Sequence, residues 1–361
     1  MSWGWVRRGG VHYDVRCLNH EESAMRSVHC LGDSKVTIGE SPKPSADELS
    51  LVMRVKASAI CGSELHALRM KPEELPAEYD NGGHEVVGVV EEAPAGSEFK
   101  AGDRVGARIV EGCGECTFCE QGYDTACLNK RIYAEPGGHA EYFRVGVRSA
   151  HRVPDGCDWP EGAILTGDGL GVPIRAARRL GDTKGKQVAV LGLGPVGLSN
   201  TLVQSWGGAR VMGVDISAYR VNLAKELGAE EAVLGGESHD VEQAVMDWTD
   251  GRGADIVMIA AGRAEVFKTG FDLVRQQGTI IQVGELEELT FNPSGVFIRR
   301  EATMMGSWYY ASQDWPNMLA AHESGMPYGK LITHRFPFEE AQAAYDTFVS
   351  GESGKVVLTY E

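Results

Sequence analysis

The 361-residue chain lacks an apolar run long enough to span a membrane, and it lacks an excess of positive charge. It carries 35 Lys and Arg residues against 51 Asp and Glu residues, which gives a formal net charge of −16. This balance argues against nucleic acid or an anionic membrane surface as the main partner. Arg7 and Arg8 are followed by no apolar segment, so no secretory signal is recognisable and a cytoplasmic location is expected.

Cysteine is also scarce, yet half of the eight cysteines lie close together. Cys113, Cys116, Cys119 and Cys127 are separated by two, two and seven residues. Four thiolates can close a tetrahedron around one zinc ion and leave no open position, which predicts a structural zinc site. An iron–sulfur cluster is disfavoured, because its usual last gap is about three residues followed by Pro, whereas Leu128 follows here. Disulfides would require an oxidising compartment.

The length of the chain suggests two domains. Short strand-like segments separated by Gly, Pro and Asp turns dominate the first part, which predicts an all-β domain with a few short helices. These segments are residues 27–30, 35–38, 51–57, 85–91, 104–109 and 140–147. Residues 1–24 show no periodicity and are expected to form a loose extension.

From about residue 160, strand and helix patterns alternate, which predicts βαβ units and a parallel sheet with helices on both faces. Strands are expected at 187–191, 211–215, 232–234, 255–260 and 279–283. Helices are expected from 195, at 217–227, from 240 and at 265–276, then at 315–323 and 338–350 before a last strand at 355–360. Ser217 is a suitable N-cap, and Gly228 and Gly278 are expected to end two of the helices.

A glycine motif, Gly192-Leu-Gly194-Pro195-Val196-Gly197, links the first of these strands to the first helix. This G-x-G-x-x-G pattern is weak alone but informative between a strand and a helix. The first glycine permits a tight turn, the second lets the backbone approach a pyrophosphate, and the third allows close packing of helix and strand. Pro195 suits the first helical turn. We therefore predict a dinucleotide site at this helix N-terminus.

Asp215 ends the next strand, 18 residues after Gly197. A carboxylate at that position accepts the ribose hydroxyls and repels a 2′-phosphate, so it favours NAD over NADP. FAD is a minor alternative for this motif. A simple glycine turn beside a solvated aspartate is the non-functional interpretation.

Two short motifs carry further candidate ligands. Cys61-Gly62-Ser63-Glu64-Leu65-His66 follows the strand at 51–57, and Gly83-His84-Glu85 precedes the strand at 85–91. Neither motif is specific alone, because a single buried Cys or His is more often structural. Their value lies in their combination with the cysteine cluster and the glycine motif.

From about Met25 to the C-terminus, these features together resemble the zinc-dependent medium-chain alcohol and polyol dehydrogenases. The resemblance implies a mainly β, GroES-like catalytic domain with a structural zinc lobe, formed by residues 25–169 and 312–361. It also implies a doubly wound α/β Rossmann domain formed by residues 170–311. Homodimers or homotetramers are implied as well.

The resemblance further implies a second, catalytic zinc ion held by Cys61 and His84, giving two zinc ions per chain. Asp168, in Leu165-Thr-Gly-Asp168, stands where a third ligand is expected; the Glu-Pro of sorbitol-type enzymes is missing there. One thiolate, one carboxylate and a neutral histidine would balance the charge of Zn²⁺. Glu85 is expected either to bind the metal directly or to support its ligands.

In the resembling family, a proton leaves the alcohol through a serine or threonine and the nicotinamide ribose, and a histidine ends this relay to solvent. Ser63 and His66 have the matching positions here. An imidazole that titrates near neutrality suits the end of such a relay.

The favoured function is reversible hydride transfer between NAD and a secondary alcohol, polyol or sugar. A non-catalytic nucleotide-binding or redox-sensing protein is the rival from another class, and a zinc-free reductase is the rival within the superfamily. Trp308, Tyr309 and Tyr310 are expected to form pocket walls or dimer contacts, and His139 is expected to be structural.

Overall fold

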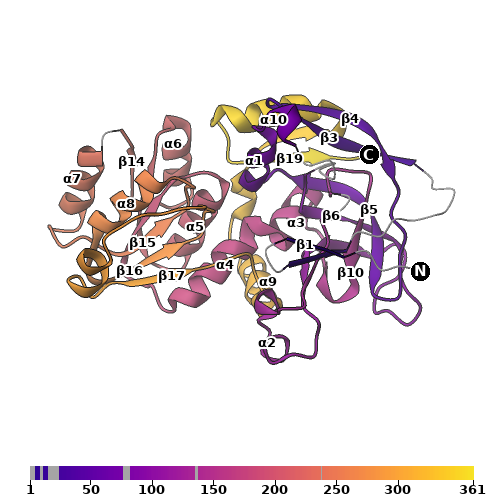
Figure 1. Cartoon of the computed structure of the whole chain (residues 1–361), viewed down its shortest axis with the longest axis horizontal. Helices are drawn as coiled ribbons and strands as arrows, with labels where there is room; N and C mark the ends of the chain where they lie inside the picture. The colour runs from indigo at the N-terminus through magenta and orange to yellow at the C-terminus, as the bar shows by residue number, and fades with distance from the viewer. Residues whose placement is uncertain (1–4, 9–10, 15–23, 76–81, 135–136, 237) are drawn as a thin grey trace.

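The computed structural model describes residues 5–8, 11–14, 24–75, 82–134, 137–236 and 238–361. Two lobes are evident in Figure 1, with the α/β domain on the left and the β-rich domain on the right. No helix in the described residues is both long and apolar enough to cross a membrane.

The β-rich domain is built on a seven-stranded sheet with the strand order β11-β7-β6-β5-β19-β18, in which β10 also pairs with β5. Strand β19 lies inside this sheet, antiparallel to β5 and parallel to β18, so the last strand of the chain returns to the first domain. A two-stranded sheet, β3 and β4, packs nearby. The strands are β3 (Ala24–Gly32), β4 (Lys35–Pro42), β5 (Ser50–Ala59), β6 (Glu85–Glu92), β7 (Arg104–Ala107), β10 (Tyr142–Gly146), β11 (Ala150–Arg152), β18 (Ile332–Pro337) and β19 (Lys355–Thr359).

The second domain is a six-stranded, fully parallel sheet with the order β14-β13-β12-β15-β16-β17. The central strand β12 is buried along its whole length, as expected of a strand covered on both faces. This doubly wound arrangement confirms the predicted fold class. The strands are β12 (Gln187–Leu191), β13 (Arg210–Asp215), β14 (Glu231–Leu234), β15 (Ala254–Ile259), β16 (Val274–Gln282) and β17 (Thr303–Gly306), and the helices are α5 (Pro195–Trp206), α6 (Ala218–Glu226), α7 (Ser238–Trp248) and α8 (Ala264–Leu273).

Helix α8 and strand β16 differ from the prediction. The helix ends at Leu273 and the strand begins at Val274, so Gly278 lies within a strand and does not end a helix. The early start of β16 is stabilised by pairing of Val274 with Ala254 and by an ion pair between Arg275 and Asp255 at 2.6 Å. The helix end at Gly228 agrees with the prediction, because this residue follows α6 with φ +102°.

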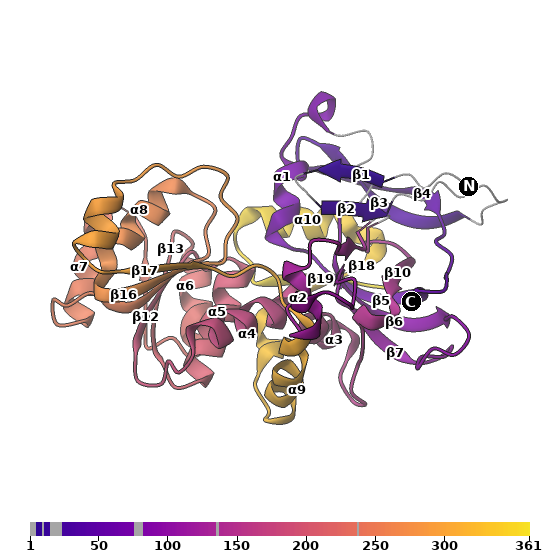
Figure 2. The same ribbon diagram turned by 60° about the horizontal axis from the view of Figure 1, so that its bottom comes forward.

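The N-terminal segment also differs. Residues 5–8 and 11–14 form an antiparallel pair, β1 (Trp5–Arg8) and β2 (Val11–Asp14) (Figure 2). Strand β2 pairs in parallel with β9 (Arg131–Ile132), which pairs with β8 (Val110–Glu111). These residues therefore differ from the expected loose extension, because they pair with each other and, through β2, with β9.

The two domains are joined by α3 (Trp159–Thr166) and α4 (Asp168–Leu180), and the chain returns after β17 through α9 (Trp315–Glu323) and α10 (Ala341–Ser350). Tyr309 and Tyr310 lie buried at this return. The Tyr310 hydroxyl donates to the Thr166 carbonyl, and the Ile109 amide donates to the Tyr309 hydroxyl at 2.9 Å. These two tyrosines therefore join the domains within one chain, whereas Trp308 is 46% exposed.

Candidate active site

Four ligand-type side chains meet between the domains. Cys61 follows β5, His84 directly precedes β6, Glu85 begins β6, and Asp168 begins α4. One possible ligand atom from each of them lies within 4.8 Å of the others. Asp168 Oδ2 is 3.1 Å from His84 Nε2 and 3.8 Å from Cys61 Sγ. The structure thus brings together all the residues predicted for the catalytic zinc.

The donor set fits a zinc ion. Sulfur, nitrogen and carboxylate oxygen are the ligands that zinc takes in proteins, with bond lengths that place neighbouring donors roughly 3–4 Å apart. Asp168 Oδ1 is buried and has no hydrogen-bond partner among the described residues. Burial disfavours a charged His84, yet the negative charges of Cys61 and Asp168 raise its pKa well above the usual range. Two acidic ligand groups thus face one imidazole, and a cation bound among them would be stabilised by both.

Glu85 is engaged differently from the other three. Its Oε1 pairs with Lys355 Nζ, and its Oε2 accepts the Gly169 amide at 3.1 Å. Both members of the pair are fully buried. Burial lowers the pKa of Lys355, but the charges of Glu85 and Cys61 outweigh it and raise this pKa. Lys355 was not predicted: a lysine at the start of an apolar strand gives no sequence signal for burial beside a metal site.

The second cluster is formed by the four cysteines between β8 and β9. Cys116 precedes α2 (Thr117–Glu120), and Cys127 follows the 3₁₀ helix η3 (Asp124–Ala126). Cys119 Sγ lies 4.0 Å from Cys113 Sγ and 3.6 Å from Cys116 Sγ. Zinc–sulfur bonds of about 2.3 Å in a tetrahedron place the sulfurs about 3.8 Å apart, so the spacing fits.

The thiols of this cluster differ in pKa, because burial raises the pKa of Cys119 and of Cys127. The described cysteines are all free of disulfides. The backbone N–H of Glu115 is the main cause that lowers the pKa of Cys113 to about 7. A thiolate is the form that binds metal, so an amide-stabilised Cys113 suits a metal ligand.

The glycine motif forms a tight turn from β12 into α5. Gly192 has φ +88°, and a Cβ there would lie 2.8 Å from Ala261 Cβ. A Cβ at Gly197 would collide with the Gly192 carbonyl, whereas a Cβ at Gly194 would meet open space. The N-terminus of α5, at Pro195 and Val196, is therefore accessible to a phosphate group.

Asp215 lies beside this turn at the end of β13. Its Oδ2 accepts the Leu193 amide at 2.6 Å and its Oδ1 accepts the Ser217 amide at 2.8 Å. Each carboxylate oxygen has a second lone pair, so ribose hydroxyls could still be accepted. Arg220, which sequence reasoning missed, donates to the Ser353 carbonyl at 3.0 Å and interacts electrostatically with Asp215.

Ser63 and His66 lie on the turn that follows Cys61, in the 3₁₀ helix η1 (Gly62–Glu64) and helix α1 (Leu65–Leu68). Both residues are exposed, and neither side chain forms a hydrogen bond with another described residue. They are accessible, but the structure does not link them to each other.

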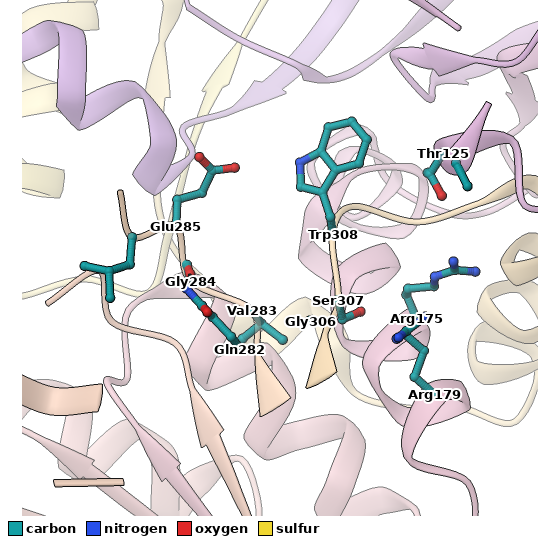
Figure 3. Close-up of a pocket in the computed structure, with 12 residues that line it drawn as sticks. Thr125, Arg175, Arg179, Gln282, Val283, Gly284, Glu285, Gly306, Ser307 and Trp308 are labelled. Carbon is teal, nitrogen blue, oxygen red and sulfur yellow. Dashed lines mark hydrogen bonds between the residues drawn. The ribbon is translucent and has the colours of Figure 1, made fainter. Parts of the chain in front are cut away.

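A cavity of about 450 Å³ lies at the carboxyl ends of β16 and β17, where ligands of doubly wound sheets bind (Figure 3). Figure 3 shows Glu285 on one side, Arg175 and Arg179 on the other, and Trp308 above Ser307. The metal ligands are not part of its lining. The complete lining is Thr125, Ala126, Arg175, Arg179, Gln282, Val283, Gly284, Glu285, Leu286, Gly306, Ser307 and Trp308.

Comparison with known proteins identifies the family that shares this architecture. Residues 47–155 match the model of the alcohol dehydrogenase GroES-like domain, and residues 195–324 match the model of the zinc-binding dehydrogenases. Together with the two cysteine-containing clusters, these matches define a zinc-type dehydrogenase.

Full-length relatives extend the match. A sorbitol dehydrogenase of Halalkalibacterium halodurans is 31% identical over 91% of this chain and 96% of its own length. An L-threonine 3-dehydrogenase of Coxiella burnetii is 30% identical over 89% of this chain and 94% of its own. The structure of the alcohol dehydrogenase TADH from Thermus sp. ATN1 superposes with a TM-score of 0.82 at 26% identity, covering 93% of this chain and 100% of that one. The chain belongs to the zinc-dependent medium-chain dehydrogenase family, whose members are oxidoreductases acting on CH–OH groups.

Proposed function

We propose that this protein transfers a hydride reversibly between NAD and a small secondary alcohol, polyol or sugar. The observation that carries the proposal is the convergence of Cys61, His84 and Asp168, with one Asp168 oxygen buried and unpartnered. A chain that only bound nucleotides would not need this group of ligands.

Cys61, His84 and Asp168 would hold the catalytic zinc, which when bound acts as a Lewis acid that polarises the alcohol oxygen. The four cysteines would hold a second, structural zinc, so two zinc ions per chain are proposed. Lys355 and the Gly169 amide hold both Glu85 oxygens, which supports Asp168 and not Glu85 as the resting ligand.

The chain itself must remove a proton and exclude water. Ser63 would accept the proton of the alcohol, and His66, exposed on the same turn, would pass it to solvent. Cys61 and Asp168 are buried, so they would shield the metal side of the site from water.

The cofactor would lie along the carboxyl edge of the parallel sheet. Its pyrophosphate would face the N-terminus of α5, and its adenosine ribose would lie beside Asp215. The nicotinamide end would extend toward the cavity at β16 and β17. NAD itself supplies the hydride chemistry. Asp215 disfavours a 2′-phosphate and therefore NADP.

The substrate is proposed to be a small polar alcohol. Two of the relatives are named for sorbitol and L-threonine, both of which carry a secondary hydroxyl. Polyols and hydroxy amino acids are therefore the first classes to test.

We also propose a homodimer or homotetramer. Strand β17 is the edge strand of the nucleotide sheet, and its first residue, Thr303, is exposed. Such an edge offers unpaired backbone groups to a second copy.

The test is NADH formation from NAD with secondary alcohols, polyols, aldoses and L-threonine, with NADP run in parallel. Turnover on one class, lost in Cys61→Ala, would support both substrate class and catalytic metal. Absence of turnover on every class, with NAD still bound and only one zinc per chain, would favour the rival reading of a nucleotide-binding sensor.

A further inference from the structure

Next to the two loops that carry Cys61 and His84 lies a buried pair of polar side chains, Glu64 and His139. Glu64 belongs to η1, and His139 lies just before β10. The side chains are 5% and 0% exposed, and His139 Nε2 is 3.0 Å from Glu64 Oε2. We call these two residues the Glu64–His139 pair.

The pair is the centre of a longer chain of hydrogen bonds. The Tyr345 hydroxyl, from α10, donates to Glu64 Oε2 at 2.6 Å. On the other side, His139 Nδ1 lies 2.8 Å from the hydroxyl of Ser58 in β5, which lies 3.0 Å from the Tyr360 hydroxyl. Elements distant in the sequence therefore hold the imidazole ring from both of its nitrogens.

The pair contacts the Cys61 loop directly. Glu64 Oε1 accepts the backbone N–H of Cys61 at 2.9 Å. This bond fixes the backbone at the residue whose thiolate is one of the proposed metal ligands. Glu64 itself is not a member of the group of possible metal ligands.

The pair contacts the His84 loop as well. The His139 amide donates to the Gly82 carbonyl at 3.2 Å, and the Gly138 amide donates to the Gly83 carbonyl at 2.8 Å. A Cβ at Gly82 would lie 2.5 Å from Glu64 Oε2, and a Cβ at Gly83 would lie 2.5 Å from the backbone nitrogen of His139. Only glycines allow the chain before His84 to lie this close to the pair.

Both oxygens of the buried Glu64 carboxyl have hydrogen-bond partners. Oε1 accepts the Cys61 amide, and Oε2 lies within hydrogen-bond distance of His139 Nε2 and the Tyr345 hydroxyl. A buried carboxyl group needs such partners to keep one position. Removing the His139 ring nitrogens would therefore loosen the side chain that binds the Cys61 amide and packs against Gly82.

We propose that His139 is a positioning residue for the catalytic metal site: through Glu64 it holds the loops of Cys61 and His84 at the separation that metal binding requires. This inference rests on the proposed function of that site. It assigns a role in the reaction to a histidine that the sequence suggested was structural only.

The experiment compares His139→Phe, which keeps an aromatic ring but loses the donor, with His139→Gln, which keeps a donor. The matched control is His334→Phe, a half-buried histidine of β18 whose Nδ1 lies 2.9 Å from the Thr333 hydroxyl. Each zinc-loaded protein is challenged with a chromogenic chelator, and the release rate of each zinc equivalent is measured. Cobalt-substituted samples report the ligand geometry through their thiolate-to-metal absorption bands.

We expect His139→Phe to release one zinc equivalent about 10–100-fold faster, because residues that orient metal ligands have effects of that size. The other equivalent should leave at the wild-type rate, and the cobalt bands should shift. The zinc release rates and cobalt bands of His139→Gln should lie closer to those of the wild type, and those of His334→Phe should equal the wild-type values.

Lower thermal stability in His139→Phe with unchanged zinc release and cobalt bands would overturn the inference, because it would show a merely structural pair. If His139→Phe does not fold, Tyr345→Phe is measured in its place. It should release one zinc equivalent about 2–10-fold faster, because one hydrogen bond is lost. An unchanged release rate overturns the inference. A wild-type protein that binds only one zinc would overturn the proposed metal site, and the role of His139 with it.

Discussion

Asp168 begins α4 with one carboxylate oxygen near His84 and Cys61 and the other buried without a partner. If it is a zinc ligand, Asp168→Ala should lower the zinc content from two to one per chain. Turnover should fall at least about 100-fold, because a Lewis acid contributes several kcal/mol to the stability of the transition state. Metal analysis and steady-state kinetics check this, with Asp155→Ala, an exposed carboxylate, as the control. Full zinc content and normal turnover would refute the assignment.

Lys355 and Glu85 form an ion pair with no exposed surface. Lys355→Met leaves an uncompensated buried carboxylate, and we expect a loss of about 3–5 kcal/mol in the free energy of unfolding. The double variant Glu85→Gln/Lys355→Met should recover much of this loss, because it removes both charges. Urea denaturation of the zinc-loaded proteins measures the difference. Equal stability of Lys355→Met and wild type would contradict the prediction.

At this scale, sequence reasoning found the residues whose chemistry is visible in a local motif. For Cys61, His84 and Asp168 the motifs were not specific alone, and the ligand roles came from the family resemblance; the structure places the three side chains together. Lys355 was missed, because it stands 270 residues from Glu85 and its own neighbourhood reads as an ordinary apolar strand. Such pairs depend on topology, which no short motif records.

At the scale of elements, local signals were the most reliable. Ser217 was predicted as an N-cap, and its hydroxyl accepts the Arg220 amide at 3.3 Å. The start of β16 was missed, because its first residues are held by pairing with β15 and by the Arg275–Asp255 ion pair. Strands β1 and β2 were missed for the same reason, since a partner elsewhere in the chain determines them.

The segment with the four cysteines, residues 113–127, is stabilised in part by contacts with residues outside it. Asp124, in η3, pairs with the buried Arg108 at 2.6 Å and accepts the Ser312 amide at 2.9 Å. If zinc holds this segment, Cys119→Ser should release Asp124, leave Arg108 without its counter-charge and lower the melting temperature.

The measurement is calorimetry together with zinc analysis. NAD affinity should be little changed, because the nucleotide turn lies in the other domain. Cys30→Ser, at a half-buried cysteine of β3 outside the cluster, should keep both zinc ions and the wild-type melting temperature. A Cys119→Ser protein with two zinc ions and unchanged melting would show that the cluster is not a zinc site.

At the scale of the whole molecule, the two domains meet at the turn before β19. The Ser217 hydroxyl donates to the Gly351 carbonyl at 3.0 Å, and Arg220 donates to the Ser353 carbonyl at 3.0 Å. Two residues further along, Lys355 reaches Glu85 at the metal cluster. The proposed cofactor ribose site and the proposed metal site thus share one short stretch of chain.

The exposed edge of β17 predicts association between copies. Light scattering of the purified protein should give a mass of two or four chains, and Thr303→Lys should shift the protein toward smaller species, because it adds a charge at the edge strand. The matched control is Lys225→Glu, a charge change at an exposed residue of α6, which packs against β13 and β14 at the other side of the sheet. A monomeric wild type would disprove this prediction.

Strand β19 lies between β5 and β18, yet it follows the entire nucleotide domain in the chain. During synthesis, Lys355 leaves the ribosome 270 residues after Glu85. At about 5–20 residues per second, this is a delay of roughly 15–55 s. The nucleotide domain can fold within that interval, whereas the seven-stranded sheet stays incomplete until β19 has been synthesised. The carboxylate beside the metal cluster stays without its counter-charge until then, so the order of translation makes the active centre the last part of the protein to mature.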